Sequence, residues 1–311
     1  MDNFFIFKTE QLIPNAWLAS AKQVRVFNPS IIKTEQGWIM AYRFVADDQV
    51  RRIALCRLSD DLEIIPDTAF AFSDYVRGAS RNWFADPRLY KVGKKLILYW
   101  NTGWHEPRNY QYMQELDINT LQPNSILISL NVKENQNALE KNWMFFGQDL
   151  EFAVYSVNPH RILKRNLELG FEAPLEDAFN QVWDNARYES VYGKLRGGCP
   201  PQLVGDKYYS VCHSVYGVAG DYRYQAVCYT FSASAPFRPM GRPRGGLILP
   251  VENGPTRIYE KLNPAVGEVI YPCGAVFDNG RWYISYGIND ESCAIAVIQH
   301  QAIDTVIESI D

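Results

Sequence analysis

A phrase that recurs five times along the chain constrains its fold more than any other feature. Each copy has a proline followed by a short β-forming segment, and the four clearer copies add a polar turn and a second aromatic-rich strand. The copies begin at Asn28, Asp86, Asn158, Cys199 and Tyr271. Proline suits the first residue of a strand, where its missing N–H breaks no ladder hydrogen bond, and turn sequences such as GDK and DNG suit positive φ. The phrase therefore predicts a β-hairpin with a proline at its start.

The spacing of the copies, about 40 to 70 residues, is enough for a four-stranded blade with variable outer loops. We therefore predict an all-β fold, a single five-bladed β-propeller domain over residues 1–311. In such a fold the starts of the inner strands converge on one funnel at the axis, here Asn28, Asp86, Asn158, Cys199 with Pro200, and Pro272 with Gly274. A two-sheet sandwich would not explain the recurrence.

The segment 172–190 departs from this pattern. It lacks strand alternation and contains LEDAFNQVWDNARYES, the best helical candidate in the chain. We expect a short helical insertion between blades three and four, near the mouth of the channel.

Charge and composition exclude several classes of protein. The net charge is −4 and there is no run of Lys or Arg, which argues against binding to nucleic acid or to anionic lipid. No stretch is long enough to span a membrane, and Asp2 with the short apolar run 4–7 does not resemble a secretory signal. The six cysteines are scattered, so we expect buried reduced thiols and a cytoplasmic protein. The four histidines show no metal-ligand spacing, and we expect neither a metal nor a cofactor.

Four phrases, in order, resemble glycoside hydrolase family 130. They are ADPRL at 85–89, KNWMFF at 141–146, RGGCPPQLVGDKYYSVCHS at 196–214 and YPCGAVFDNGRWYISYGIND at 271–290. The resemblance implies a five-bladed propeller that cleaves β-mannosides, mostly by phosphorolysis with inversion and in a minority of members by hydrolysis. It implies that Asp86 is the proton donor and works through a sugar hydroxyl. It also assigns substrate or phosphate contacts to Lys141, His213 and Asp290.

The residues themselves add further candidates. Asn28 starts an inner strand, Arg88 lies two residues after Asp86, and Trp104 offers a flat face to a sugar. The expected sugar contacts are Asn28, Arg43, Arg88, Trp104 and Asp290, and the expected phosphate contacts are Lys141, His213 and Arg108.

Two departures from the family pattern bear on the site. Ala85 stands where the family has Glu, and Cys212 stands where a Tyr precedes the histidine. We expect the missing hydroxyl to weaken a phosphate site, because a dianion needs several convergent donors. Since Asp86 precedes a proline, we also expect its backbone to be extended, with Arg88 pairing its carboxylate.

Several alternatives stay open at this point. An inverting hydrolase would use a carboxylate base, with Glu106 or Glu189 as candidates. A mannosyltransferase on the same fold and a sugar-binding propeller without turnover are further alternatives. The expected partners are a small oligosaccharide and inorganic phosphate, with a homo-oligomer left open.

Overall fold

The computed structural model describes residues 3–20, 23–78, 83–103, 108–134, 137, 141–169, 173–218, 220–251 and 259–310. Strands dominate it. The helices of this described part are short: α1 (Phe72–Val76), α2 (Ala186–Tyr192) and α3 (His300–Thr305), with 3₁₀ turns η1 (Thr9–Leu12), η2 (Asn15–Ser20) and η3 (Leu167–Leu169). None of these helices has the length and apolarity that a membrane crossing needs.

The first half of the chain forms three separate antiparallel sheets. The first contains β2 (Arg25–Thr34), β3 (Gly37–Val45) and β4 (Arg51–Leu58). The second contains β5 (Ala85–Val92), β6 (Lys95–Asn101), β7 (Gln111–Leu116) and β8 (Ile128–Leu130). The third contains β9 (Met144–Phe146), β10 (Phe152–Ser156), β11 (His160–Lys164) and β12 (Glu176–Gln181).

The second half forms two antiparallel strand sets within one sheet of ten strands. The fourth set contains β13 (Lys194–Arg196), β14 (Gln202–Val204), β15 (Lys207–Tyr216), β16 (Tyr222–Ser232), β17 (Pro239–Pro243) and β21 (Ile307–Ser309). The fifth set contains β18 (Val266–Asp278), β19 (Arg281–Ile288), β20 (Ser292–Gln299) and the N-terminal β1 (Asn3–Ile6). A parallel pairing of β16 with β18 joins the two sets, so the strand pairing gives four sheets where five separate ones were predicted.

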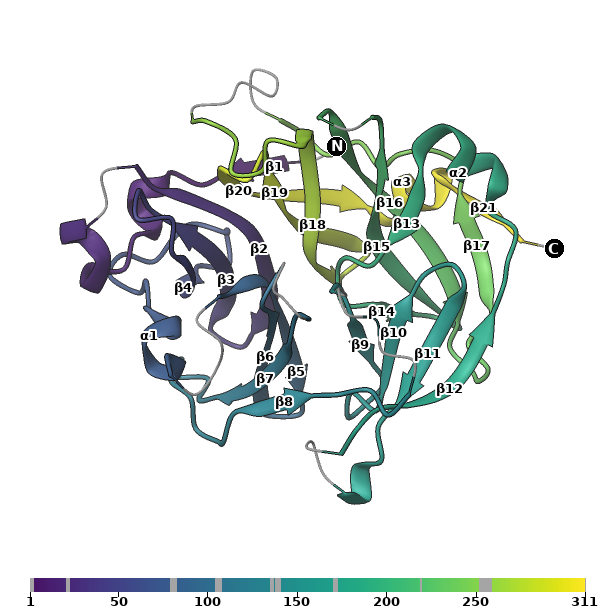
Figure 1. Cartoon of the computed structure of the whole chain (residues 1–311), viewed down its shortest axis with the longest axis horizontal. Coiled ribbons are helices and arrows are strands. Elements are labelled where there is room, and N and C mark those ends of the chain that lie inside the picture. The colour runs from purple at the N-terminus through teal and green to yellow at the C-terminus, as the bar shows by residue number, and fades with distance from the viewer. Residues whose placement is uncertain are drawn as a thin grey trace.

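The five strand sets are arranged around a common centre, with β2, β5, β9, β14 and β18 innermost (Figure 1). Hydrogen bonds tie neighbouring sets at this centre. The Leu89 amide donates to Ser30 Oγ over 2.9 Å, and Ser285 Oγ donates to the Pro29 carbonyl over 2.7 Å. One opening of about 500 Å³ is lined by residues of all five innermost strands, including Ile31, Leu89, Phe145, Leu203 and Ala275.

The hydrophobic core consists of clusters that join each strand set to the next. Each cluster can be represented by one pair of buried residues, in chain order Ile39 with Leu98, Tyr99 with Phe145, Met144 with Tyr229, and Val211 with Trp282. A further cluster joins Trp38 of the first set to Ile295 of the fifth. The packing therefore runs from set to set and returns to its start, although no single sheet closes.

One expectation about an individual segment was wrong, and another was confirmed only in part. Asn158 lies in the turn between β10 and β11, where its amide donates to Glu189 Oε1 over 3.1 Å, and β9 takes the innermost place in the third set. In the segment predicted to be helical, the first part is the strand β12 and only 186–192 is helical. The side chains of 176–181 are mostly exposed or half-buried, so pairing of the backbone with β11 decides the structure there.

Candidate active site

A cavity of about 740 Å³ lies beside the starts of the innermost strands. Its walls combine aromatic and aliphatic side chains with six charged residues: Arg43, Arg51, Asp86, Lys141, Arg196 and Asp290. Four positive groups against two carboxylates make the lining basic, although the chain as a whole carries a net charge of −4. A cavity of this size with a few convergent polar groups suits a small polar ligand with negative charge.

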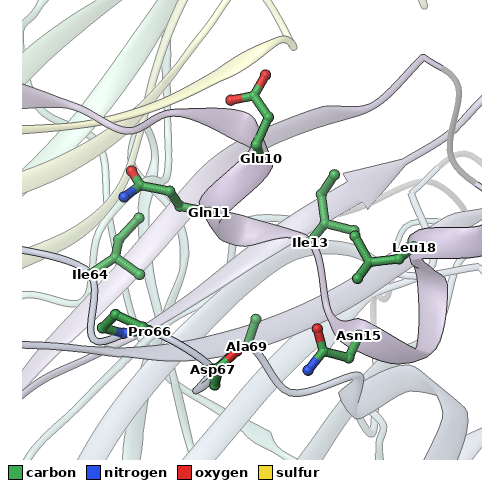
Figure 2. Close-up of a pocket in the computed structure, with 9 residues that line it drawn as sticks. All are labelled: Glu10, Gln11, Ile13, Asn15, Leu18, Ile64, Pro66, Asp67 and Ala69. Carbon is green, nitrogen blue, oxygen red and sulfur yellow. The ribbon is translucent and has the colours of Figure 1, made fainter.

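A smaller cavity of about 230 Å³ lies between the N-terminal 3₁₀ turns and the loop at 64–69 (Figure 2). The charged residues of its lining are Glu10 and Asp67, and no basic side chain joins them. It therefore lacks the groups that would hold an anion.

Three polar residues at the inner strand starts have left-handed backbone conformations. Asn28, Asp86 and Asn142 have φ values of 53°, 49° and 71°. The strand pairing is irregular at two of them, between Phe27 and Ser30 and between Ala85 and Arg88. The extended backbone expected for Asp86 is therefore wrong. Such conformations cost roughly 1–3 kcal/mol in non-glycine residues and gather at functional sites, where the surrounding structure enforces them.

Close packing holds Asn28 in this position. A Cβ at Gly287 on β19 would lie 2.7 Å from the Asn28 backbone nitrogen, so only glycine allows this approach. The Asn28 side chain in turn reaches the second strand set, because its Nδ2 donates to Asp86 Oδ1 over 2.9 Å. The first and second sets thus position Asp86 together.

The two carboxylate oxygens of the buried Asp86 have different surroundings. Oδ1 accepts hydrogen bonds from Asn28 and from Arg43 Nη1, the latter over 3.1 Å. Oδ2 has one long contact, 3.5 Å to the hydroxyl of Tyr271. Among the described residues, Oδ1 is therefore the more strongly bonded oxygen, and Oδ2 keeps capacity to accept a further hydrogen bond.

Charge and burial act in opposite directions on the pKa of Asp86. Burial raises the pKa. The positive charges of Arg43, Lys141 and Arg88, with the hydrogen bond from Asn28, lower it by more than burial raises it. The result is a pKa of about 2. Asp86 is thus ionised at neutral pH.

Arg88 supports Asp86 from behind. The fully buried guanidinium donates to the Gly198 carbonyl, to the Asp86 carbonyl and to Asn142 Oδ1, the last two over 3.1 and 3.4 Å. It is not among the residues that line the cavity. The ion pair to the Asp86 carboxylate, expected from Arg88, is made by Arg43.

Lys141 and Arg196 are the basic groups of the cavity that have neither a hydrogen bond nor an ion pair to any described residue. Lys141 is half-buried, and burial with the nearby charges of Arg43 and Arg196 lowers its pKa despite Asp86 and Asp290. Arg196 is exposed at the end of β13. Two like charges with no partner within the described part of the chain favour an external anion. Arg196 lay within a phrase that the sequence singled out, but nothing there distinguished it from a surface arginine.

His213 lies behind the wall of the cavity. Its buried ring stacks on Tyr224 with 5.5 Å between centroids and meets Tyr271 edge to face at 4.7 Å. Burial, followed by the charges of Arg196, Lys141 and Arg88, lowers its pKa to about 3, so the ring is neutral at neutral pH. The structure places His213 where it supports the two tyrosines, outside the cavity lining.

Cys212 is fully buried in the cluster between the third and fourth strand sets, with Met144 and Tyr229. Its side chain faces away from the cavity, because neighbouring residues of a strand point to opposite sides. Cys212 is not among the residues that line the cavity, and the effect of this departure on a phosphate site stays a prediction.

The structure brings together Asn28, Arg43, Asp86, Lys141 and Asp290 of the predicted residues. Arg108 lies with its guanidinium over the Tyr110 ring, 5.3 Å from the centroid, and is not part of the lining. Trp104 and Glu106 lie outside the described residues. Glu189, the second candidate base, accepts hydrogen bonds from Asn158 and Asn185 away from the cavity.

Sequence reasoning missed the hydroxyl of Tyr271. It donates a hydrogen bond to Asn142 Oδ1 and accepts one from Arg88 Nη2 over 3.4 Å. It also lies 3.5 Å from Asp86 Oδ2. The tyrosine opens the fifth copy of the recurring phrase, and its position there was the available signal. Among the described residues, no three His, Cys, Asp or Glu side chains gather in a way that would hold a metal ion. All six cysteines are buried and unpaired, as expected.

No family model and no curated protein sequence matches the chain. Solved structures do match. The β-1,2-mannobiose phosphorylase from Listeria innocua is 14% identical, with 97% of this chain and 98% of that chain covered and a TM-score of 0.67. A second structure comes from a study of glycoside hydrolases in the GH130 family of mannoside phosphorylases. It is 11% identical, with 96% of this chain and 94% of that chain covered and a TM-score of 0.60.

A mannose phosphorylase from Leishmania mexicana, in complex with phosphate ion, is 14% identical over 94% of this chain and 89% of that chain, with a TM-score of 0.51. At these identities the likeness shows the fold. The chain has the fold of the mannoside phosphorylases and hydrolases of glycoside hydrolase family 130.

Proposed function

We propose that the chain is a carbohydrate-active enzyme, an inverting glycoside phosphorylase that cleaves a short β-mannoside-like sugar with inorganic phosphate. The observation that carries this proposal is the arrangement around Asp86: it lines a cavity together with the cations Lys141 and Arg196, which have no hydrogen-bond or ion-pair partner among the described residues. A carboxyl group and an anion site in one cavity are what phosphorolysis requires. The fold shared with mannoside phosphorylases supports the same assignment.

The five strand sets act as the blades of one propeller domain in this proposal. The ring of hydrophobic clusters supports it, because each set packs on the next and the fifth packs on the first. The axis then becomes the place where residues of all the sets meet. Asn28, Arg43 and Asp290 would contact the sugar whose glycosidic bond is cleaved.

The ionised state of Asp86 sets a condition on the mechanism. A general acid must carry a proton, and the cations around Asp86 oppose this. Phosphate bound at Lys141 and Arg196 offsets their charge, which raises the pKa of Asp86 toward a range where it takes up a proton. An H₂PO₄⁻ ion that enters the cavity can supply that proton and leave HPO₄²⁻ as the nucleophile.

The reaction then balances without another reactant. An oxygen of HPO₄²⁻ attacks the anomeric carbon while the bond from that carbon to the leaving oxygen breaks. The proton of Asp86 passes to the leaving oxygen, through a sugar hydroxyl if the family relay applies. The products are a sugar 1-phosphate of inverted configuration, a free sugar and the Asp86 carboxylate.

An inverting hydrolase is the second candidate, and Asp290 is the observation that favours it. Asp290 and Asp86 are the two carboxylates of the described lining, and an inverting hydrolase needs a second carboxylate to activate water. The two functions separate in one experiment, in which a panel of β-mannosides is incubated with and without phosphate. Formation of sugar 1-phosphate would support the phosphorylase. Release of free sugar without phosphate would support the hydrolase, and the absence of any product would support a binding protein.

A further inference from the structure

Trp83 differs from the other tryptophans that the structure describes. The others, Trp17, Trp38, Trp100, Trp143, Trp183 and Trp282, are at most 8% exposed and pack in the core. Trp83 lines the cavity, and 36% of its surface is exposed. A large apolar ring at the wall of a basic cavity leaves apolar area in contact with water, which a ligand with an apolar face would cover.

Neighbouring residues fix the plane of the indole. The guanidinium of Arg51 lies over the ring, 4.8 Å from its centroid, and Arg51 Nη1 is anchored on the Gln49 carbonyl over 2.6 Å. A Cβ at Gly103 would lie 3.1 Å from Trp83 Nε1 and 3.6 Å from the Ala85 Cβ, so small residues border the ring edge. A cation thus lies over the indole, which still lines the cavity with about a third of its surface exposed.

Ala85 is a further apolar residue on this side of the cavity. It also lines the cavity, next to Asp86, at the position where the resembling family has Glu. A methyl group there offers no hydrogen bond to a sugar hydroxyl. An apolar group therefore stands beside Asp86 where the resembling family has a carboxylate.

We propose that Trp83 is the stacking platform for the leaving group, and that this subsite takes a ring with an apolar face, either a pyranose or an aryl group. This inference rests on the proposed function, because it places the leaving group beside the proton of Asp86. Without a carboxylate at position 85, the subsite selects shape and apolar area more than a pattern of hydroxyl groups. The enzyme should therefore accept aryl β-mannosides as well as mannobiose.

The test compares Trp83→Ala with Trp83→Phe in the full chain. An aromatic pair contributes about 0.5–1.5 kcal/mol beyond area burial, so Trp83→Ala should raise the KM for phenyl β-mannoside and for mannobiose about 3- to 10-fold. Trp83→Phe should keep most of the affinity. The KM for phosphate should not change in either variant. The stacking role of Trp83 would be overturned if the KM for phosphate rose as much as the KM for the sugars, or if the KM for the sugars did not rise.

A binding measurement separates this inference from the proposed function. Phenyl β-mannoside is titrated into wild type and Trp83→Phe, and tryptophan fluorescence is recorded without phosphate. The platform predicts a saturable change in wild type that is lost in Trp83→Phe, even if the wild type turns nothing over. Absence of the change in wild type, or its persistence in the variant, would contradict the platform, whereas turnover without phosphate would count against the phosphorylase alone.

Discussion

At the residue scale, the site depends on Asp86 being a carboxylate surrounded by cations. Arg43 is bonded to Oδ1, and Lys141 and Arg88 add positive charge from two other sides. Tyr271 and Asn142 complete the polar surroundings without adding charge, and Asp290 supplies the other carboxylate of the lining. An anion that binds the cations must therefore change the protonation of Asp86, since the two equilibria are linked.

This linkage gives a prediction that needs no turnover. Sulfate, which does not titrate, should bind with net uptake of up to one proton per site at pH 5, because its negative charge counteracts the positive field that lowers the Asp86 pKa to about 2. Calorimetry in buffers of different ionisation enthalpy measures the uptake. Asp86→Asn should bind sulfate without it. Uptake that survives in Asp86→Asn would place the proton on His213, whose pKa the same cations lower, and no uptake in wild type would contradict the mechanism.

The unpaired cations give a second prediction. Lys141→Ala and Arg196→Ala should each raise the KM for phosphate about 10- to 100-fold and that for the sugar much less, because each removes a charge-assisted hydrogen bond of about 1.5–3 kcal/mol. Steady-state kinetics with each substrate varied in turn provides the measurement. Lys94→Ala, in the exposed turn between β5 and β6, is the matched control. If Arg196→Ala behaved like Lys94→Ala, Arg196 would not belong to the anion site.

Part of the site could be predicted from single residues and part could not. Asp86, Lys141 and Asp290 stand in recognisable phrases, and the structure puts all three in one cavity. The left-handed backbone of Asp86 was not predictable, because local sterics before proline favour an extended chain and only the surrounding strand sets enforce φ of 49°. The role of Arg196 could not be predicted, because only the position of β13 in the folded structure places this residue at the cavity.

At the scale of elements, β15 shows how strand alternation separates roles. Its odd and even residues point to opposite faces, so His213 faces Tyr224 and Tyr271 while Cys212 faces the third strand set. The hairpins were predictable for the same reason, since proline starts and polar turns are local signals. The third copy was misplaced because β9 is three residues long and Asn142, before it, has no proline after it.

The alternation on β15 makes a specific prediction for Cys212→Tyr. A phenol is much larger than the fully buried thiol it replaces, so the variant should lose about 1–3 kcal/mol of unfolding free energy through overpacking. Urea denaturation measures this, with Cys212→Ala as the small-residue control. The KM for phosphate should not fall. A stable variant with tighter phosphate binding would show that this side chain does reach the cavity.

At the scale of the whole molecule, stability and function depend on the same ring of packed strand sets. The N-terminal β1 pairs with β20, so the first strand of the chain completes the fifth set, while the last strand, β21, pairs with β17 of the fourth set. The β-class fold was predictable from a repeat that cannot bury its surfaces alone. The joining of the fourth and fifth sets through β16 and β18 was not, because this pairing depends on backbone proximity that no sequence pattern marks.

The buried histidines predict how stability changes with pH. Burial lowers the pKa of His160 and of His213 from 6.5 to about 3 in the folded protein. Below pH 6.5 the unfolded chain binds protons that the folded chain does not, so the stability present at neutral pH is lost as the pH falls toward 3. Each group contributes about 1.4 kcal/mol per pH unit once it titrates in the unfolded state.

Urea unfolding between pH 8 and pH 5 checks this prediction. The free energy of unfolding should be nearly constant above pH 7.5 and fall steeply below pH 6.5. A curve that stays flat down to pH 5 would mean that both rings take up protons in the folded protein.

Phosphorus NMR on the intact enzyme tests the central claim most directly. Wild-type protein is incubated with inorganic phosphate and β-linked mannobiose, and the spectrum is followed with proton NMR of the anomeric region. The account predicts a new phosphate ester of inverted, α configuration, formed together with free sugar, and its loss by about 10²- to 10⁴-fold in Asp86→Asn. Free sugar released at the same rate with or without phosphate, and no phosphate ester, would contradict it.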